Sequence, residues 1–218
     1  MQKLKLSWVR RHLDPDSVAK YEHMLQRKQE NAGPFKAGMV QHLSALNDGV
    51  IAIFITVMML EIPYPTSERS YFEFGWSILV FLVSFFIIAD FWYDNKAIFQ
   101  MIREADHMVV IANFLFLASL ALIPVTTKWI INETNRVAAF HFGIVYFIST
   151  LLQQFLFFAA LRTRFRQHLK LLLMMMAGRI GFLLAVNALL MLMAWFQPKW
   201  AILLFIILPV ISFFRPQD

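Results

Sequence analysis

Residues 42–65, HLSALNDGVIAIFITVMMLEIPYP, decide the fold class because they combine an apolar run with a single internal carboxylate. Residues 39–62 are typical of a membrane-spanning helix, and Asp48 lies about two turns into that helix. A charged side chain at membrane depth costs at least about 2.5 kcal/mol. We therefore expect Asp48 to have hydrogen-bond donors close by, and the surrounding sequence has to supply them.

The composition of the chain indicates a polytopic membrane protein. Of its 218 residues, 59% are hydrophobic and 16% are charged, and 23 are Phe. Soluble domains are usually about 45–50% apolar. The absence of cysteine excludes disulfides, thiolate metal sites and cysteine nucleophiles. The net charge of +6 is interpreted here through its position relative to the membrane, and nucleic acid is not expected as a partner.

Six apolar stretches of near-spanning length follow one another, joined by short polar loops. The sequence therefore predicts an all-α protein whose six transmembrane helices form one membrane domain over residues 39–218. The stretches lie at about 39–62, 71–93, 107–126, 137–161, 169–195 and 199–214.

Residues 1–38 are polar and basic, with eight Lys or Arg, and they lack the apolar core of a signal peptide. Asp14 or Asp16 is a suitable cap for a short helix, and Gly33–Pro34 is predicted to end it. This helix has no strong apolar face, so we expect a cytoplasmic or membrane-surface segment that is separate from the membrane domain.

Lys and Arg are distributed unevenly between the two sides of the predicted membrane domain. The N-terminal segment and the loops at 94–106 and 162–170 hold most of them, whereas the opposite loops hold four in total. Because basic residues accumulate on the cytoplasmic side, both termini are predicted to be cytoplasmic. An even number of spans agrees with this orientation.

The first span has two different faces when it is drawn as a helix that turns about 100° per residue. Ile53, Val57 and Leu60 form one apolar stripe, and Thr56 lies beside it. Asp48 points about 140° away from Ile53. If the stripe lined a pore, Asp48 would therefore point toward the other spans and would hold the first helix in place there.

The donors available to Asp48 come from three regions of the sequence. Trp92, Asn95 and Lys96 lie at the cytoplasmic end of the second span, and Asn113 lies in the third. The local alternatives are His42, Ser44 and Asn47. These residues favour a polar network that packs the first span, and they disfavour a ring of ion-coordinating carboxylates.

The same stretch resembles the signature of the prokaryotic relatives of transmembrane protein 175, the endosomal/lysosomal potassium channel. That signature is an Arg, three residues, Phe-Ser-Asp and then an apolar helix. Here it appears as His42, Leu46, Asn47 and Asp48 followed by GVIAIFITVMMLEIP. Residues 84–99, SFFIIADFWYDNKAIF, and 113–127, NFLFLASLALIPVTT, are similar to the family's second and third spans. His42, Leu46 and Asn47 depart from the signature, and Asn95 and Lys96 stand where a His pair is expected.

The resemblance implies a homotetramer of six-helix subunits whose first helices line a central pore. It assigns a narrow hydrophobic gate to Ile53, Val57 and Leu60, and it relates Thr56 to potassium preference. The structural polar network would consist of six residues: His42, Asn47, Asp48, Trp92, Asn95 and Asn113. The sequence contains no carbonyl filter loop of the TVGYG type.

The expected function is thus a weakly selective, potassium-permeable cation channel in a prokaryotic plasma membrane, with potassium, membrane lipids and further copies of the chain as partners. No catalytic residues, cofactor or metal site are expected. A non-conducting family member and a secondary transporter are the alternatives. A transporter would be expected to have two related halves, and an intramembrane enzyme would need a cluster of His, Asp, Glu or Ser. Neither feature is visible in the sequence.

Overall fold

The structure is a computed structural model that describes residues 15–67, 70–102, 105–162, 169–206 and 209. These residues form helices and short connections and contain no strand, which agrees with the predicted all-α class. The helices, in chain order, are α2 (Pro15–Leu60), α3 (Tyr71–Met101), α4 (His107–Leu120), α5 (Leu122–Asn132), α6 (Arg136–Leu161), α7 (Leu169–Phe196) and α8 (Pro198–Leu204).

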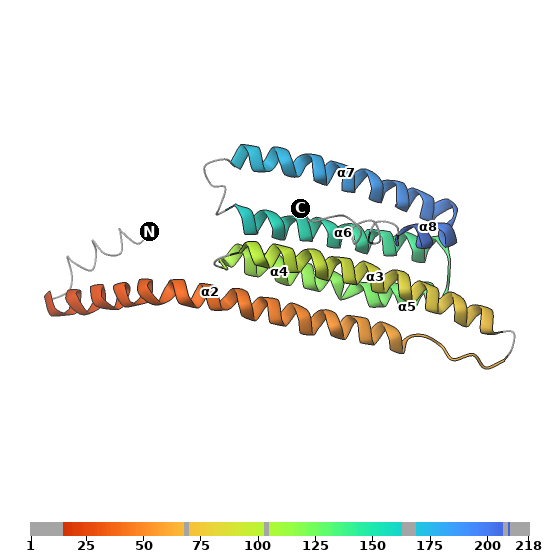
Figure 1. Ribbon diagram of the computed structural model, residues 1–218, viewed down its shortest axis with the longest axis horizontal. Helices are drawn as coiled ribbons and strands as arrows, with labels where there is room; N and C mark the ends of the chain where they lie inside the picture. The colour runs from red at the N-terminus through yellow and green to blue at the C-terminus, as the bar shows by residue number, and fades with distance from the viewer. Residues whose placement is uncertain (1–14, 68–69, 103–104, 163–168, 207–208, 210–218) are drawn as a thin grey trace.

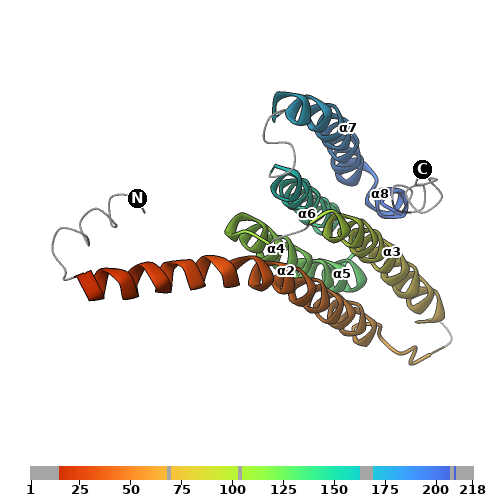
Figure 2. The same cartoon turned by 60° about the vertical axis from the view of Figure 1, so that its left-hand side comes forward.

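The helices lie side by side as an elongated bundle (Figure 1). In both ribbon views α2 and α7 occupy opposite edges, and α3, α4, α5 and α6 lie between them (Figure 2). Helix α2 packs against α3, α4 and α5, whereas α6 packs against α3, α4, α5, α7 and α8. The first long helix is therefore peripheral and α6 is central.

Four segments of the described chain are long and apolar enough to cross a membrane: Gly38–Leu60, Tyr71–Met101, His107–Asn132 and Arg136–Leu161. They coincide with the first four predicted spans, and the second and third extend further than predicted. The third span consists of α4 and α5, which meet at Ala121. Pro124 explains this junction, because it lacks the N–H that would bond the carbonyl three or four residues earlier.

The fifth and sixth predicted spans are not established. Helix α7 is 28 residues long, and the apolar helix found within it, Ile180–Phe196, is shorter than a membrane span. Helix α8 has seven residues, and residues 207, 208 and 210–214 of the predicted sixth span lie outside the described residues. The six-helix count therefore stays a prediction.

The predicted helix end at Gly33–Pro34 is wrong. Helix α2 continues through both residues and joins the N-terminal segment to the first membrane span over 46 residues. A proline inside a helix removes one hydrogen bond and bends the axis, but a long helix on either side retains its other bonds. Figure 2 shows that the N-terminal part of α2 runs away from the bundle at an angle to the rest of the helix.

The core of the bundle is tightly packed around α6. Phe116 of α4, Ile87 of α3 and Leu156 of α6 are fully buried there. Gly143 of α6 allows the closest approach, because a Cβ at this position would lie 2.9 Å from Cγ of Met191 and 3.3 Å from Phe205. The central helix is thus fixed by close packing on several sides.

Candidate functional site: the two faces of the first membrane helix

The inner face of α2 carries Asp48, which bonds to two residues of α3. Trp92 Nε1 donates to Asp48 Oδ1 at 2.8 Å, and Lys96 Nζ forms an ion pair with Asp48 Oδ2. Trp92 and Lys96 are four residues apart and therefore share one face of α3. Each oxygen of the carboxylate has its own donor, and the charge on Asp48 is balanced by that on Lys96.

Lys96 is the site residue that the predicted network left out. Its Nζ also donates to Ser44 Oγ at 3.1 Å, and it lies 5.9 Å from the centre of the Trp92 ring. One lysine thus contacts two positions on α2. The sequence indicated this role through the four-residue spacing between Trp92 and Lys96. This spacing places the lysine on the same face of α3 as the indole that donates to Asp48.

Asp48 is less enclosed than the sequence suggested. Its side chain is 44% exposed in the single chain, and that of Lys96 is 33% exposed. The pair lies in a shallow hollow between α2 and α3 that is also lined by Ser44, Asn47, Trp92, Asn95 and Phe99. The polar contacts lie at the boundary between the two helices, close to the surface of the bundle.

Asn95 lines the same hollow but does not join the network. Its side chain is buried, and neither amide atom has a hydrogen-bond partner within the described part of the chain. His42 is exposed and makes no side-chain hydrogen bond to any other described residue. Asn95 therefore lies beside Asp48, and His42 lies on the same helix as Asp48. Neither of these predicted network members forms a hydrogen bond with Asp48.

A second polar contact joins α2 to α4 through a pair of amides. Asn47 Nδ2 donates to Asn113 Oδ1 at 2.8 Å, and Asn113 Nδ2 donates back to Asn47 Oδ1 at 2.9 Å. Both side chains are buried, with 3% and 0% exposed. Because each amide satisfies the other, the pair adds no unpaired polar group to the bundle interior.

Further contacts follow toward the C-terminal end of α2. Met58 is buried and its sulfur accepts a weak hydrogen bond from Thr127 of α5 at 3.7 Å. Thr127 also bonds to Ser84 of α3 at 2.8 Å. At the end of the helix Glu61 pairs with Lys128 at 2.9 Å. Helix α2 is thus attached at several points along its inner face.

The outer face of α2 is exposed in the single chain. The exposed fractions are 58% for Ile53, 41% for Val57 and 81% for Leu60. Over the membrane segment only 22% of the best apolar window of α2 is buried, against 56% for α6. The stripe predicted from helical geometry is therefore a continuous, uncovered apolar surface in the single chain.

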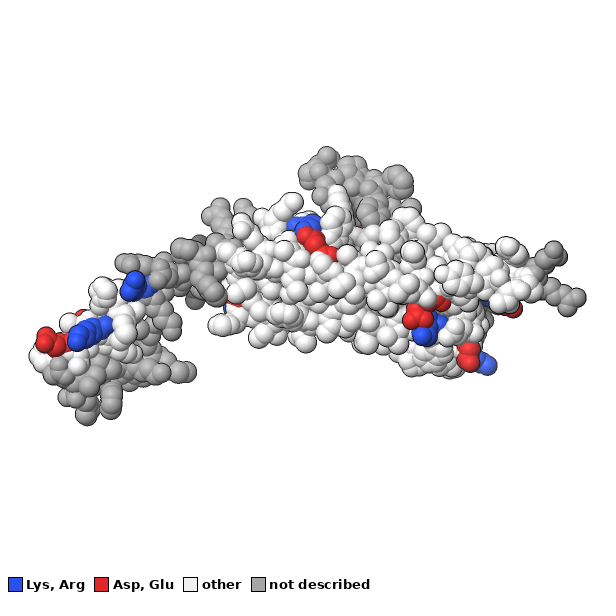
Figure 3. Space-filling view, turned by 90° about the horizontal axis from the view of Figure 1, so that it is seen from below, with Lys and Arg blue, Asp and Glu red and all other residues white. Residues whose placement is uncertain are grey.

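Figure 3 views the molecule from the side on which α2 lies in Figure 1. Charged side chains occupy the end formed by the N-terminal part of α2, and smaller groups of adjoining positive and negative side chains lie at the upper edge of the middle and toward the opposite end. The surface between these groups is broad and uncharged. Such an uncharged surface suits contact with lipid or with another copy of the chain.

Thr56 lies on the exposed side of α2 beside the stripe. Its hydroxyl donates to the carbonyl oxygen of Ile53 at 2.9 Å. The proton is therefore directed at the helix backbone, and the hydroxyl oxygen keeps its remaining capacity as an acceptor. This is the orientation in which a hydroxyl group can accept a cation or water.

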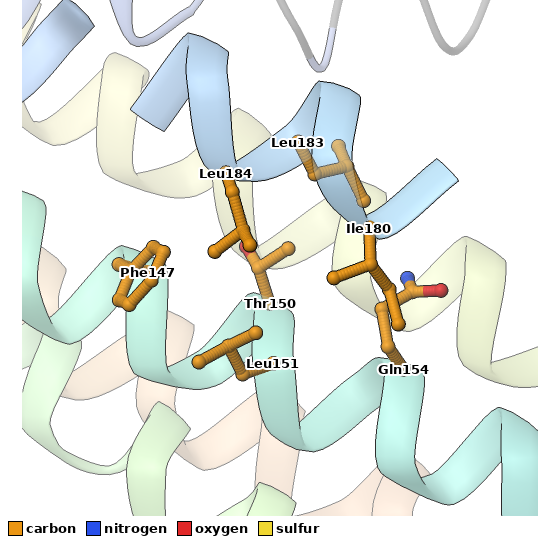
Figure 4. Close-up of a pocket in the computed structure, with 7 residues that line it drawn as sticks. All are labelled: Phe147, Thr150, Leu151, Gln154, Ile180, Leu183 and Leu184. Carbon is orange, nitrogen blue, oxygen red and sulfur yellow. The ribbon is translucent and has the colours of Figure 1, made fainter. Parts of the chain in front are cut away.

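A second hollow lies between α6 and α7 and has a different character. Figure 4 shows its lining residues from the two helices: Phe147, Thr150, Leu151 and Gln154 on α6, and Ile180, Leu183 and Leu184 on α7. Thr150 bonds to the carbonyl of Tyr146, so its hydroxyl proton is used within the helix. This hollow is mostly apolar and contains none of the predicted site residues.

No cluster of three or more His, Asp or Glu suited to a metal ion occurs among the described residues. The polar groups of the site instead hold helices together, and the apolar groups face outward. The fold and the site together define an α-helical membrane protein whose first spanning helix is pinned on one side and uncovered on the other.

Comparisons with known proteins find the same family that the sequence resembles. The model of the endosomal/lysosomal potassium channel TMEM175 family matches residues 42–124, which include α2 from His42 onward, α3, α4 and the start of α5. This match confirms the resemblance found in the sequence over that part of the chain.

Two curated relatives are bacterial proteins named potassium channels. One, from Chryseobacterium sp. (strain P1-3), is 32% identical over 108 residues, which are 47% of this chain and 56% of the relative. The other, from Chamaesiphon minutus, is 32% identical over 109 residues, covering 44% of this chain and 54% of the relative. The chain thus spans about half the length of the curated relatives it matches.

A solved structure shares the fold. The crystal structure of a lysosomal potassium-selective channel TMEM175 homolog from Chamaesiphon minutus has a TM-score of 0.66 and 22% sequence identity. The similarity covers 83% of this chain and 100% of that one.

Proposed function

We propose that this protein is a potassium-permeable cation channel in a prokaryotic plasma membrane. The observation that carries the proposal is the uncovered apolar stripe on α2, formed within the segment that matches the TMEM175 family. Two curated relatives that match slightly less than half of the chain are named potassium channels. Four copies placed with their α2 helices around a common axis would cover the stripe and enclose a pore.

The gate in this proposal is hydrophobic. Ile53, Val57 and Leu60 lie on successive turns of α2, so four copies would form three apolar rings along the axis. A narrow apolar constriction closes a channel by excluding water. Opening requires α2 to rotate or splay, which widens the rings and lets hydrated ions pass.

Selectivity in this proposal comes from Thr56 and the helix backbone rather than from a loop of carbonyl groups. The Thr56 hydroxyl bonds to its own helix and leaves its oxygen available. Four such oxygens beside the constriction would replace part of the hydration shell of a cation. A filter of this kind provides few ligands, and we therefore expect weak selectivity.

The polar inner face sets the position of α2 in the closed channel. Asp48 is held by Trp92 and Lys96 of α3, and Asn47 is held by Asn113 of α4. Since these contacts fix the rotation of α2, they also fix which side chains face the axis. The uneven distribution of Lys and Arg supports an orientation with both termini in the cytoplasm.

The proposal is tested by the reversal potential of the purified protein in planar bilayers under a potassium/sodium gradient. A value near the potassium equilibrium potential supports a potassium-permeable channel. Ile53→Asn should raise the current about tenfold or more, because an asparagine at the constriction is hydrated more easily than an isoleucine. Burial of an isoleucine side chain is worth about 1.5–3 kcal/mol, and every 1.4 kcal/mol corresponds to a factor of about ten.

Ile111→Asn provides the matched control for this experiment. Ile111 lies on α4 and is 57% exposed, almost the same as Ile53, but it is not on the proposed pore face. This variant should leave the current unchanged. Equal currents from both variants and the wild type would reject the gate. Silence from all three, with the oligomer intact, would indicate a non-conducting family member, and flux that requires a co-substrate would indicate a transporter.

A further inference from the structure

The continuity of α2 through Gly33–Pro34 makes a second pattern visible. Counting back from Leu60 in steps of seven gives an apolar residue at every position of a row that runs through the whole helix. The row consists of Val18, Leu25, Ala32, Met39, Leu46, Ile53 and Leu60. Its C-terminal members lie on or beside the exposed stripe, and its N-terminal members lie in the segment before the membrane.

The N-terminal part of this row has a companion three residues further on, as in a coiled coil. The companion positions are Tyr21, Lys28 and Phe35. Five of the six row and companion positions between Pro15 and Gly38 are hydrophobic, against three of the other eighteen. Residues 15–38 therefore have an apolar face that is interrupted at Lys28. A short helix that ends at Gly33–Pro34 contains too few of these positions for the face to be recognised.

A repeat of seven has a structural consequence. A straight α-helix drifts by about 20° per heptad relative to such a repeat, so the row faces one partner only if the helices supercoil to the left. A row kept over six heptads therefore indicates helices that wind around one another. The row is continuous with the α2 face that the proposed function assigns to contacts between copies.

The charges of residues 15–38 are compatible with such an association. Four basic and three acidic residues occur in this range, so several copies can approach without a large net repulsion. Lys28 is the one charged residue at a companion position. A lysine at such a position lowers the stability of a coiled coil and restricts its register and number of chains.

The N-terminal half of α2 lies outside the residues that the family model matches. The family model begins at residue 42. The N-terminal half of α2 thus precedes the segment matched by the family model, and it projects from the bundle in Figure 2.

We propose that the N-terminal half of α2, residues 15–38, is an assembly segment that binds the same segment of other copies in a parallel, left-handed helical bundle. The bundle would extend from the membrane into the cytoplasm along the pore axis. This inference rests on the proposed function for its axis and its orientation, and it adds a contact between copies outside the membrane.

Single cysteines test the inference directly, because the native chain has none. Val18→Cys and Leu25→Cys place a thiol on the row, and Lys20→Cys and His23→Cys place one on the opposite side of the same helix. After mild oxidation of the full-length protein in membranes, the first two variants should yield several-fold more disulfide-linked dimer than the last two. Ile53→Cys reports separately on contacts between the membrane halves of α2.

The outcomes distinguish this inference from the proposed function. Cross-linking of Ile53→Cys together with equal, low yields at all four N-terminal positions would overturn the inference and leave the channel proposal standing. Cross-linking at Val18 and Leu25 but not at Ile53 would support the assembly segment and contradict the central position of α2. Lys28→Leu should increase the detergent resistance of the oligomer if the inference is correct, and a decrease would count against it.

Discussion

The membrane segments of helices α2 and α6 have the same mean hydropathy, 1.9, but the two helices are held in the protein in different ways. Helix α6 is central, and close packing fixes it through residues such as Gly143 and Leu156. Helix α2 is peripheral, and discrete polar contacts attach its inner face to α3, α4 and α5. Closely packed side chains fit together in one arrangement, whereas a few polar side chains can exchange one hydrogen-bond partner for another. In the proposed channel we therefore expect α2 to be the element that moves and α6 to be part of the scaffold.

The largest effect on the attachment of α2 is expected from Lys96→Met. Removing the lysine takes away the ion pair with Asp48 and the hydrogen bond to Ser44. Because both partners of the ion pair are partly exposed, the stability of the bundle should fall by about 1–2 kcal/mol. The measurement is the thermal unfolding of the purified protein in detergent. Lys128→Met is the control, because the exposed pair with Glu61 should contribute less than about 1 kcal/mol.

The double variant Asp48→Asn/Lys96→Met sharpens this result. If the pair acts as a unit, removing both charges should restore part of the stability that the single change loses. Strictly additive losses would show that Asp48 and Lys96 do not act together, and would weaken the assignment of α2's attachment to this contact.

Gly143→Ala should reveal the packing that holds α6. The added methyl group would meet Met191 at 2.9 Å, and overpacking of this kind costs about 1–3 kcal/mol. Gly75→Ala is the matched control on α3, where a Cβ meets nothing within 4 Å. Thermal unfolding should show a loss for the first variant and no loss for the second. Equal behaviour would contradict the close approach of α6 to α7 and α8.

Asn113→Leu should cost about 1 kcal/mol, because the buried amide of Asn47 would lose its partner. In the double variant Asn47→Leu/Asn113→Leu no unpaired amide remains, and the stability should recover relative to the single variant. A double variant less stable than Asn113→Leu alone would show that the amide pair attaches α2 by more than mutual satisfaction.

The smallest effect is expected on the outer face of α2. Thr56→Val keeps the shape of the side chain and removes the hydroxyl oxygen, so the potassium/sodium permeability ratio should fall by about twofold to fivefold. Reversal potentials under mixed-ion gradients measure this ratio. An unchanged ratio with normal current would remove Thr56 from the selectivity mechanism and leave the gate residues in place.

The parts of the fold that the sequence predicts correctly are those with a strong local signal. The first four membrane spans are long apolar runs, and they appear as helices close to the predicted positions. The prediction of a helix end at Gly33–Pro34 was wrong because a proline disrupts one turn of a helix, whereas the stability of the whole helix depends on residues on both sides. Near Pro124 the opposite occurred: one continuous third span was predicted, and the structure divides it into α4 and α5.

The candidate site was predictable to the extent that it depends on helical periodicity. The exposed stripe and the opposite position of Asp48 follow from the angle per residue. The partners of Asp48 depend on the rotation of α3, which the sequence does not specify. Lys96 was therefore only one of several possible donors and was not included in the six-residue network, whereas Asn95, one position away on α3, was included although it forms no hydrogen bond with Asp48.

The ion pair between Asp48 and Lys96 also has a consequence for biogenesis. Ribosomes synthesise Asp48 well before Lys96, so α2 reaches the insertion machinery before its counter-charge exists. An uncompensated aspartate at the centre of a helix costs about 2.5–3.5 kcal/mol during insertion. We therefore expect the integration of α2 to become more favourable once α3 supplies Lys96, which favours entry of the two helices into the lipid as a hairpin. Premature termination between them would leave a nascent segment that is poorly retained in the bilayer.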